Sequence, residues 1–388
     1  MKWRNKGHEL DSIGKNFSTV EEIYIYGAGE NGTLLYEDLK IANIKITFVD
    51  SSIQKQSLGY LDCKVISPEE FFEKTPNSKK YFTVIALGSN QISVVMKKFV
   101  LHGFREGIDA YSYKNFTEFY LPIFLMYYSQ KLYVKYLDVS LTQHCNLKCK
   151  ACSIMTPYIK QPEHKELAAL CQDIDLLFQK VDYVHSFFLI GGEPLLYPHL
   201  EEICEYIGSK YKRAIGHLVI ASNGLVTLKE RLIKTIKHYN IEFQISDYSK
   251  WIKQTEGKMN DFINTLTKFE IPYNRMVDLE WVDYGFRNDT GRKEKVENME
   301  NFFDSCGIDC RGLENGKFYY CFPARMCQKV LEYKEYEDEY FDLRGDGRKM
   351  ELLEFSLGYN EKGYLRICSR CNGSYLNNKN FIPVAEQL

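Results

Sequence analysis

Three cysteines stand close together in residues 145–152, which read Cys145-Asn146-Leu147-Lys148-Cys149-Lys150-Ala151-Cys152. Because three residues and then two residues separate them, their thiolates can converge on one inorganic centre. A [4Fe–4S] cluster takes four ligands, so three cysteines leave one iron open. That iron can bind a small molecule, as the open position of a catalytic zinc site does. The loop therefore predicts a reactive metal centre.

One predicted strand precedes this loop in the sequence and two follow it. Residues 136–142 are apolar and β-branched and run directly into it. Two later strands end in segments suited to binding a ligand, Gly191-Gly192-Glu193-Pro194 after residues 187–190 and Ser222-Asn223-Gly224 after residues 218–221. Glycines without side chains would let the backbone approach that ligand closely.

These elements resemble the radical S-adenosylmethionine (SAM) enzymes, in which a CxxxCxxC loop follows the first strand of a partial (β/α) barrel. The resemblance implies that Cys145, Cys149 and Cys152 bind a [4Fe–4S] cluster. It also implies that SAM is bound by Gly191, Gly192, Glu193 and Pro194 at the methionine amino group and by Ser222 and Asn223 at the ribose. The family often has an aromatic residue before the third cysteine, and this chain has Ala151. A zinc site and buried core thiols are the alternatives.

Composition places the chain among ordinary globular proteins. Its 388 residues allow two or three domains, and a net charge of −2 gives no broad basic surface for nucleic acid. The sequence shows no signal peptide and no apolar run of the roughly eighteen residues that a membrane span needs. Twelve cysteines without an export signal indicate metal binding in a reducing cytoplasm. We expect a cytoplasmic protein with no nucleic-acid or membrane partner.

A second pattern lies near the N-terminus, after a polar lead-in at residues 1–19. A predicted strand at residues 22–26 is followed by Gly27-Ala28-Gly29-Glu30-Asn31-Gly32, a helix and a strand that ends in Asp50. Gly27, Gly29 and Gly32 suit close approach to a phosphate, and Asp50 could bind a ribose hydroxyl. Residues 20–115 resemble short Rossmann-like domains that bind nucleotide sugars. The alternative is a domain that only stiffens or dimerises the chain.

The remaining chain divides into three predicted parts. Residues 116–134 are aromatic and lack glycine, which suggests a linking helix. Residues 135–300 alternate strands and helices, which predicts an α/β fold with a parallel sheet, here a partial (β/α)6 radical SAM barrel. Asp247 follows one of its strands and is a candidate substrate or SAM contact, or a helix cap.

A second set of cysteines lies in residues 301–388. Gly316 stands between Cys306 and Cys321 at intervals of nine and four residues, and Cys368 and Cys371 form a CxxC pair. This spacing resembles the small α+β twitch domain, a shortened SPASM domain, and implies an auxiliary [4Fe–4S] cluster. Cys310 competes with Cys306 as a ligand, and zinc is the alternative metal. Cys327 has three alternative interpretations: a further cluster ligand, a thiol that donates a hydrogen atom, or a core residue.

The resemblance implies radical chemistry. A reduced cluster would cleave SAM to a 5′-deoxyadenosyl radical that abstracts hydrogen from a C–H bond. The auxiliary cluster would accept a second electron, as in radical SAM dehydrogenases of aminocyclitols, so we expect an oxidoreductase. The predicted substrate is a sugar, cyclitol or nucleotide-linked sugar, and the predicted electron donor is a flavodoxin or ferredoxin. Alternatives are a peptide maturase, a sugar epimerase and a non-catalytic nucleotide-binding iron–sulfur scaffold.

Overall fold

The computed structural model describes residues 1–74, 80–286 and 298–388. The chain forms two compact units, Gly7–Lys135 and a second unit of Met1–Lys6 with Tyr136–Leu388. Residues 287–297, within the predicted barrel range 135–300, lie outside the described residues. Among the helices in the described ranges, none is long and apolar enough to cross a membrane.

The first unit is built on a parallel sheet of order β3-β2-β1-β4-β5. This order matches five of the six strands of a dinucleotide-binding sheet, whose order is 3-2-1-4-5-6. Its elements are α1 Asp11–Gly14, β1 Glu22–Tyr26, α2 Glu30–Leu39, η1 Lys40–Ala42, β2 Lys45–Val49, α3 Ile53–Leu58, β3 Lys64–Ile66, α4 Pro68–Lys74, β4 Tyr81–Ile85, α5 Ser89–Leu101, β5 Ala110–Ser112, α6 Tyr113–Asn115, η2 Phe116–Tyr120 and α7 Leu121–Ser129.

Helix α7 is part of the first unit, although the sequence suggested that residues 116–134 form a separate linking helix. It packs against α1, and Leu121, Phe124 and Leu125 are fully buried. These buried side chains belong to the core of the first unit, which extends to Lys135.

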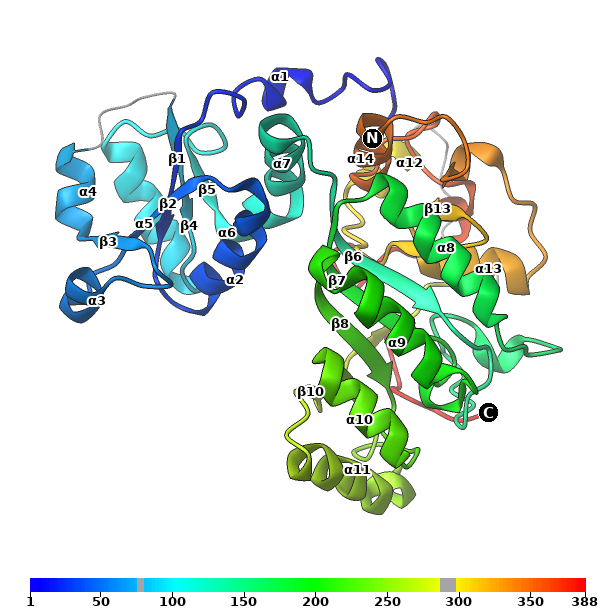
Figure 1. The fold of residues 1–388 in the computed structure, drawn as a ribbon. Coiled ribbons are helices and arrows are strands. Elements are labelled where there is room, and N and C mark those ends of the chain that lie inside the picture. Colours follow the sequence, from blue (N-terminus) through cyan, green and yellow to red (C-terminus); the bar gives the residue numbers. More distant parts are fainter. Residues whose placement is uncertain (75–79, 287–297) are drawn as a thin grey trace. The chain divides into compact units, whose positions relative to one another are not determined.

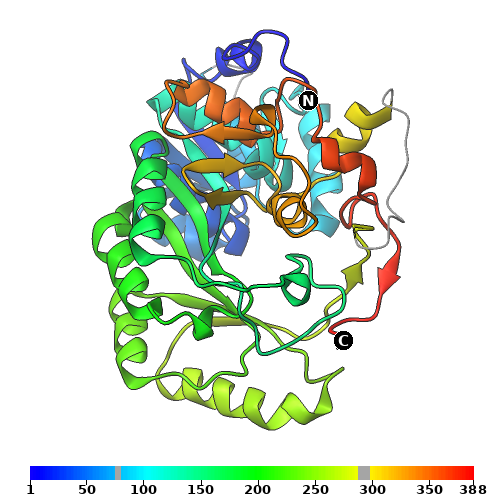
Figure 2. The same ribbon diagram turned by 90° about the vertical axis from the view of Figure 1, so that its right-hand side faces the viewer.

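The second unit contains one eight-stranded sheet of order β10-β9-β8-β7-β6-β12-β13-β14. Helices α8 to α11 lie along one face of its parallel strands (Figures 1 and 2). Its elements are β6 Tyr133–Ser140, η3 Thr156–Tyr158, α8 Leu167–Lys180, β7 Tyr183–Ile190, η4 Pro194–Leu196, α9 Leu200–Tyr211, η5 Lys212–Ala214, β8 Ile215–Ser222, α10 Glu230–Tyr239, β9 Glu242–Ser246, η6 Lys253–Thr255, α11 Glu256–Lys268, β10 Tyr273–Met276, β11 Trp281–Val282, α12 Met299–Asp304, β12 Gly312–Glu314, β13 Lys317–Tyr319, α13 Phe322–Val330, η8 Glu337–Glu339, β14 Tyr340–Asp342, α14 Lys349–Ser356, η9 Arg366–Arg370 and β15 Phe381–Ile382.

The segment that the sequence assigned to a separate twitch domain shares this sheet. Strand β12 pairs parallel to β6, and β13 and β14 continue antiparallel. A hairpin turn joins β12 to β13 at Asn315 and Gly316, both with positive φ. Asp173 on α8 accepts hydrogen bonds from both turn amides. The hairpin thus covers an edge of the barrel strands instead of folding apart from them.

Candidate functional site

The cysteine loop begins just beyond β6 and is held by the glycine segment that follows β7. Gly192 N donates to Thr142 O and Glu193 N donates to His144 O, both at 2.8 Å. A Cβ atom on Gly192 would lie 2.2 Å from His144 O. The sequence suggested that Gly191 and Gly192 make room for a ligand. The close neighbour is instead the chain leading into Cys145, so the glycines are needed for contact between two backbone segments.

The carboxylate of Glu193 connects the glycine segment after β7 with the Ser222-Asn223-Gly224 segment after β8. Its side chain is 1% exposed and accepts hydrogen bonds from Ser222 Oγ (2.8 Å), Asn223 N (2.8 Å) and Leu195 N (3.1 Å). Burial raises the pKa of Glu193 to about 7, against the lowering effect of these donors. Pro194 begins the short helix η4, which turns Leu195 N toward the carboxylate.

Asn223 connects this carboxylate to the cysteine loop. Its Nδ2 donates to Asn146 Oδ1 at 2.7 Å and lies 4.0 Å from Cys145 Sγ. The structure therefore brings together the three motifs that the sequence singled out, although they come from three different strand ends. Asp247, after β9, is 3% exposed and does not share these contacts. Its carboxylate accepts hydrogen bonds from Ser249 N and Arg275 Nε at 2.8 Å each. The Asp247 side chain therefore stabilises the turn that follows β9.

The donor set of the loop fits a thiolate-bound cluster. Burial raises the pKa of Cys145 to about 12 and also raises that of Cys149, so each needs a cationic centre to become a thiolate at neutral pH. Backbone and side-chain N–H groups already point at these sulfurs, with Leu147 N 3.4 Å from Cys145 Sγ. Among the described residues, no three His, Cys, Asp or Glu side chains are arranged to hold a single metal ion.

Four cysteines of the second set line one apolar cavity beside α12 and α13. Its walls include Tyr284, Phe303 and Ile367, and its four thiols are those of Cys306, Cys321, Cys368 and Cys371. Burial raises the pKa of Cys371 to about 12 and also raises that of Cys321. Thiols in so apolar a site gain charge only together with a metal centre, so this donor set also fits a cluster.

Cys310 and Cys327 do not line that cavity. Cys310 Sγ lies 3.9 Å from Asp309 Oδ1 and beside Asp138 on β6, where burial raises the pKa of Asp138 to about 7. Cys327 is fully buried on α13 within an apolar cluster that includes Met155 and Leu365. Its environment is that of a core residue, and a thiol buried there is poorly placed to give hydrogen to a substrate.

In the first unit, the predicted nucleotide site forms a tight turn. Gly27 has φ +115°, and a Cβ on Gly32 would lie 2.2 Å from Gly27 O, so both positions need glycine. A Cβ on Gly29 would meet no atom within 4 Å, which leaves space at the turn. The Asp50 carboxylate, expected to face a ribose, accepts from Ala28 N at 2.8 Å and Ser52 N at 2.9 Å. Asp50 thus fixes the shape of the turn.

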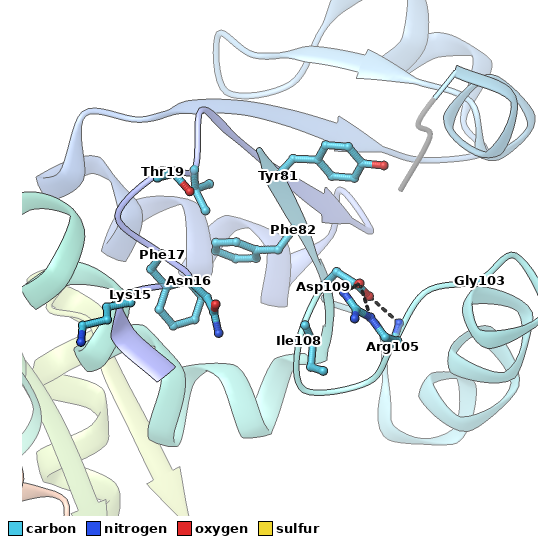
Figure 3. Close-up of a pocket in the computed structure, with 11 residues that line it drawn as sticks. Lys15, Asn16, Phe17, Thr19, Tyr81, Phe82, Gly103, Arg105, Ile108 and Asp109 are labelled. Carbon is cyan, nitrogen blue, oxygen red and sulfur yellow. Dashed lines mark hydrogen bonds and ion pairs between the residues drawn. The ribbon is translucent and has the colours of Figure 1, made fainter. Parts of the chain in front are cut away.

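A cavity of about 570 Å³ lies elsewhere in this unit. It is lined by residues next to the beginnings of β1 and β4, including Phe17, Val20 and Tyr81 (Figure 3). The glycine turn follows the other end of β1. Arg105 at the cavity wall is already paired with Asp109 at 3.0 Å. The cavity is therefore distinct from the predicted nucleotide site, because ligands of such sheets bind at the carboxyl ends of the strands.

One family model matches the part of the chain that carries the cysteine loop and the segments after β7 and β8. Residues 139–247 match the model of the Radical SAM superfamily. GTP 3′,8-cyclase of Aquifex aeolicus is 31% identical over 193 residues, which are 47% of this chain and 56% of that protein. The chain thus matches little more than half of that relative's length. Mitochondrial GTP 3′,8-cyclase of Arabidopsis thaliana is 32% identical over 100 residues, 24% of each chain.

Two solved structures show limited similarity. BtrN in complex with AdoMet and 2-DOIA has 18% identity and a TM-score of 0.41, over 66% of this chain and 97% of BtrN. Native anSMEcpe with bound AdoMet and Cp18Cys peptide has 14% identity and a TM-score of 0.39, over 60% of this chain and 81% of that one. The motifs and the family match together identify residues 139–247 as a radical SAM domain, a family that implies SAM and a [4Fe–4S] cluster.

Proposed function

We propose that the chain is a radical SAM oxidoreductase that removes hydrogen from a sugar, a cyclitol or a nucleotide-linked sugar. The observation that carries this proposal is a set of hydrogen bonds that joins Ser222 and Asn223 to Glu193, and Asn223 in turn to Asn146 of the cysteine loop. Cys145, Cys149 and Cys152 would hold the cluster. When bound, the cluster and SAM supply the one-electron chemistry that gives a 5′-deoxyadenosyl radical.

Glu193 would bind the methionine amino group of SAM. The carboxyl group is buried, and burial favours its neutral form. A bound ammonium group would restore the ionised form, because an opposite charge at hydrogen-bond distance lowers the pKa of a carboxyl group. Ser222 and Asn223 hold the carboxylate in one orientation, so the amino group would meet a fixed acceptor.

Cys306, Cys321, Cys368 and Cys371 are the proposed ligands of the auxiliary cluster. Their common cavity supports this set, with Cys310 as the spare cysteine. The wall of this cavity is apolar, with Tyr284, Phe303 and Ile367 among its lining residues. Four protein ligands leave no open iron, which suits electron transfer. If this cluster accepts an electron from the substrate, the net reaction is an oxidation. A flavodoxin or ferredoxin would be the external electron donor.

The first unit is proposed to bind the nucleotide part of the substrate at the Gly27–Gly32 turn. The open space at Gly29 supports this, and scaffolding is the alternative. A second candidate reaction is cyclisation of a nucleotide, because the curated relatives are GTP 3′,8-cyclases. Both reactions begin with hydrogen abstraction from a sugar-like carbon, and they differ in the mass of the product.

The test is anaerobic reconstitution with iron and sulfide, followed by SAM, a reductant and pools of nucleotides, nucleotide sugars, aminocyclitols or peptides. Loss of two hydrogens, about two mass units, from one pool member supports the oxidation. In deuterated solvent, a product about one mass unit heavier than the substrate indicates epimerisation, and a product of unchanged mass indicates cyclisation. SAM cleavage stimulated only by peptides refutes the sugar proposal. Cys145→Ser should abolish cleavage, and Cys171→Ser on α8 is the matched control.

A further inference from the structure

Residues 384–388 pair with the cysteine loop, although more than 230 positions separate them in the sequence. Lys150 N donates to Glu386 O at 2.7 Å, and Leu388 N donates to Lys148 O at 2.9 Å. The pairing is antiparallel, with Cys149 opposite Gln387. Val384 (6% exposed) and Ala385 (1%) pack in the same apolar cluster as Cys149. The loop is therefore paired along its backbone and covered by apolar side chains.

The side chain of Gln387 makes two contacts with the loop. Its Oε1 accepts from Lys148 N at 2.8 Å, and its Nε2 lies 3.3 Å from Cys149 Sγ. Nε2 also donates to Ala385 O at 2.7 Å. Reversing the amide would set Oε1 against Ala385 O and Nε2 against Lys148 N–H. The backbone partners thus fix the orientation in which an N–H points at the sulfur.

We propose that Gln387 is a positioning residue for the cluster on the cysteine loop, donating a hydrogen bond to the Cys149 thiolate and setting the reduction potential of the cluster. The inference rests on the proposed function, since it requires a cluster on Cys149. Hydrogen bonds to cluster sulfurs are among the features that set potential. An N–H donor stabilises the more negative, reduced state, so its presence raises the potential. A higher potential makes reduction by a cellular donor easier.

The experiment compares Gln387→Met and Gln387→Glu with the wild type in an anaerobic redox titration. Electron paramagnetic resonance reads the cluster signal that changes when SAM is added, which separates this cluster from an auxiliary one. Methionine keeps the length of the side chain without an N–H, so the ratio of reduced to oxidised cluster at a fixed potential should fall about tenfold, ~59 mV for one electron. Glutamate should lower the ratio further, because its charge repels the thiolate.

Glu386→Gln is the matched control. It removes an exposed ion pair with Lys150 (3.2 Å) and leaves the backbone pairing in place, so the titration should equal that of the wild type. Loss of iron from Gln387→Met with retention in Glu386→Gln also supports the contact. An unchanged titration of Gln387→Met, or equal changes in Glu386→Gln, overturns the inference. If the wild type shows no SAM-sensitive signal, the cluster on Cys149 is refuted. That result contradicts the proposed function itself and is distinguishable from a failure of the inference about Gln387.

Discussion

Gly192→Ala is expected to displace the cysteine loop. The added Cβ would lie 2.2 Å from His144 O and 3.0 Å from Cys145 Cβ, whereas Cβ atoms essentially never have neighbours within 3.0 Å. The two segments must therefore separate by at least 0.8 Å, measured against that 3.0 Å limit. Separation weakens the hydrogen bonds Gly192 N–Thr142 O and Glu193 N–His144 O. Overpacking costs ~1–3 kcal/mol and each lost hydrogen bond ~1 kcal/mol, so the expected loss of unfolding free energy is ~3–5 kcal/mol.

Denaturant unfolding of the metal-free protein measures this loss, and iron analysis after reconstitution measures binding at the displaced loop. Gly257→Ala is the control in the same unit. It lies in the first turn of α11, where an added Cβ meets no atom within 4 Å. That variant should be as stable as the wild type or gain up to ~1 kcal/mol, since alanine is the better helix former. Wild-type stability and full iron content in Gly192→Ala would refute the role given to Gly192.

Two further predictions concern the C-terminal part of the second unit. Cys306→Ser should lose the iron of the auxiliary site and Cys310→Ser should keep it, because Cys306 lines the four-thiol cavity; iron analysis decides. Glu314 is 5% exposed, and its burial alone would raise the pKa of its carboxyl group. Its cationic partners, among them Lys165 and Arg325, lower that pKa to about 2, below the ordinary value of 4.5. Its stabilisation is therefore complete above pH 4.5 and lost as pH falls toward 2. Between pH 6 and pH 3, wild type should lose ~2 kcal/mol of unfolding free energy relative to Glu314→Gln, and equal losses would contradict this reasoning.

The sequence predicts the regular elements of the barrel well where apolar periodicity is long. The apolar pattern predicts a helix over residues 200–211 and a strand over residues 215–222, and helix α9 at Leu200–Tyr211 and strand β8 at Ile215–Ser222 have these bounds. It also predicts a helix over residues 251–269, but α11 begins at Glu256, because residues 251–255 form a turn and the short helix η6 instead. Element ends depend on tertiary contacts that local patterns do not contain.

Non-local pairing is what the sequence does not reveal. The three residues of β12 carry too little pattern to show that they pair with β6, so a separate domain was expected where one sheet exists. The contact of Gln387 with Cys149 also has no signal in composition or spacing. Motif residues such as Glu193 were identified because their types and order are distinctive, whereas their hydrogen-bond partners required the fold.

The most direct test of the central claim is the yield of 5′-deoxyadenosine from SAM. The protein is reconstituted anaerobically, given SAM and a strong reductant, and analysed by mass spectrometry. Radical SAM chemistry at Cys145, Cys149 and Cys152 predicts 5′-deoxyadenosine from the wild type and none from variants with these cysteines replaced. A wild type that holds its iron and sulfide, yet forms no 5′-deoxyadenosine under these conditions, would contradict the account.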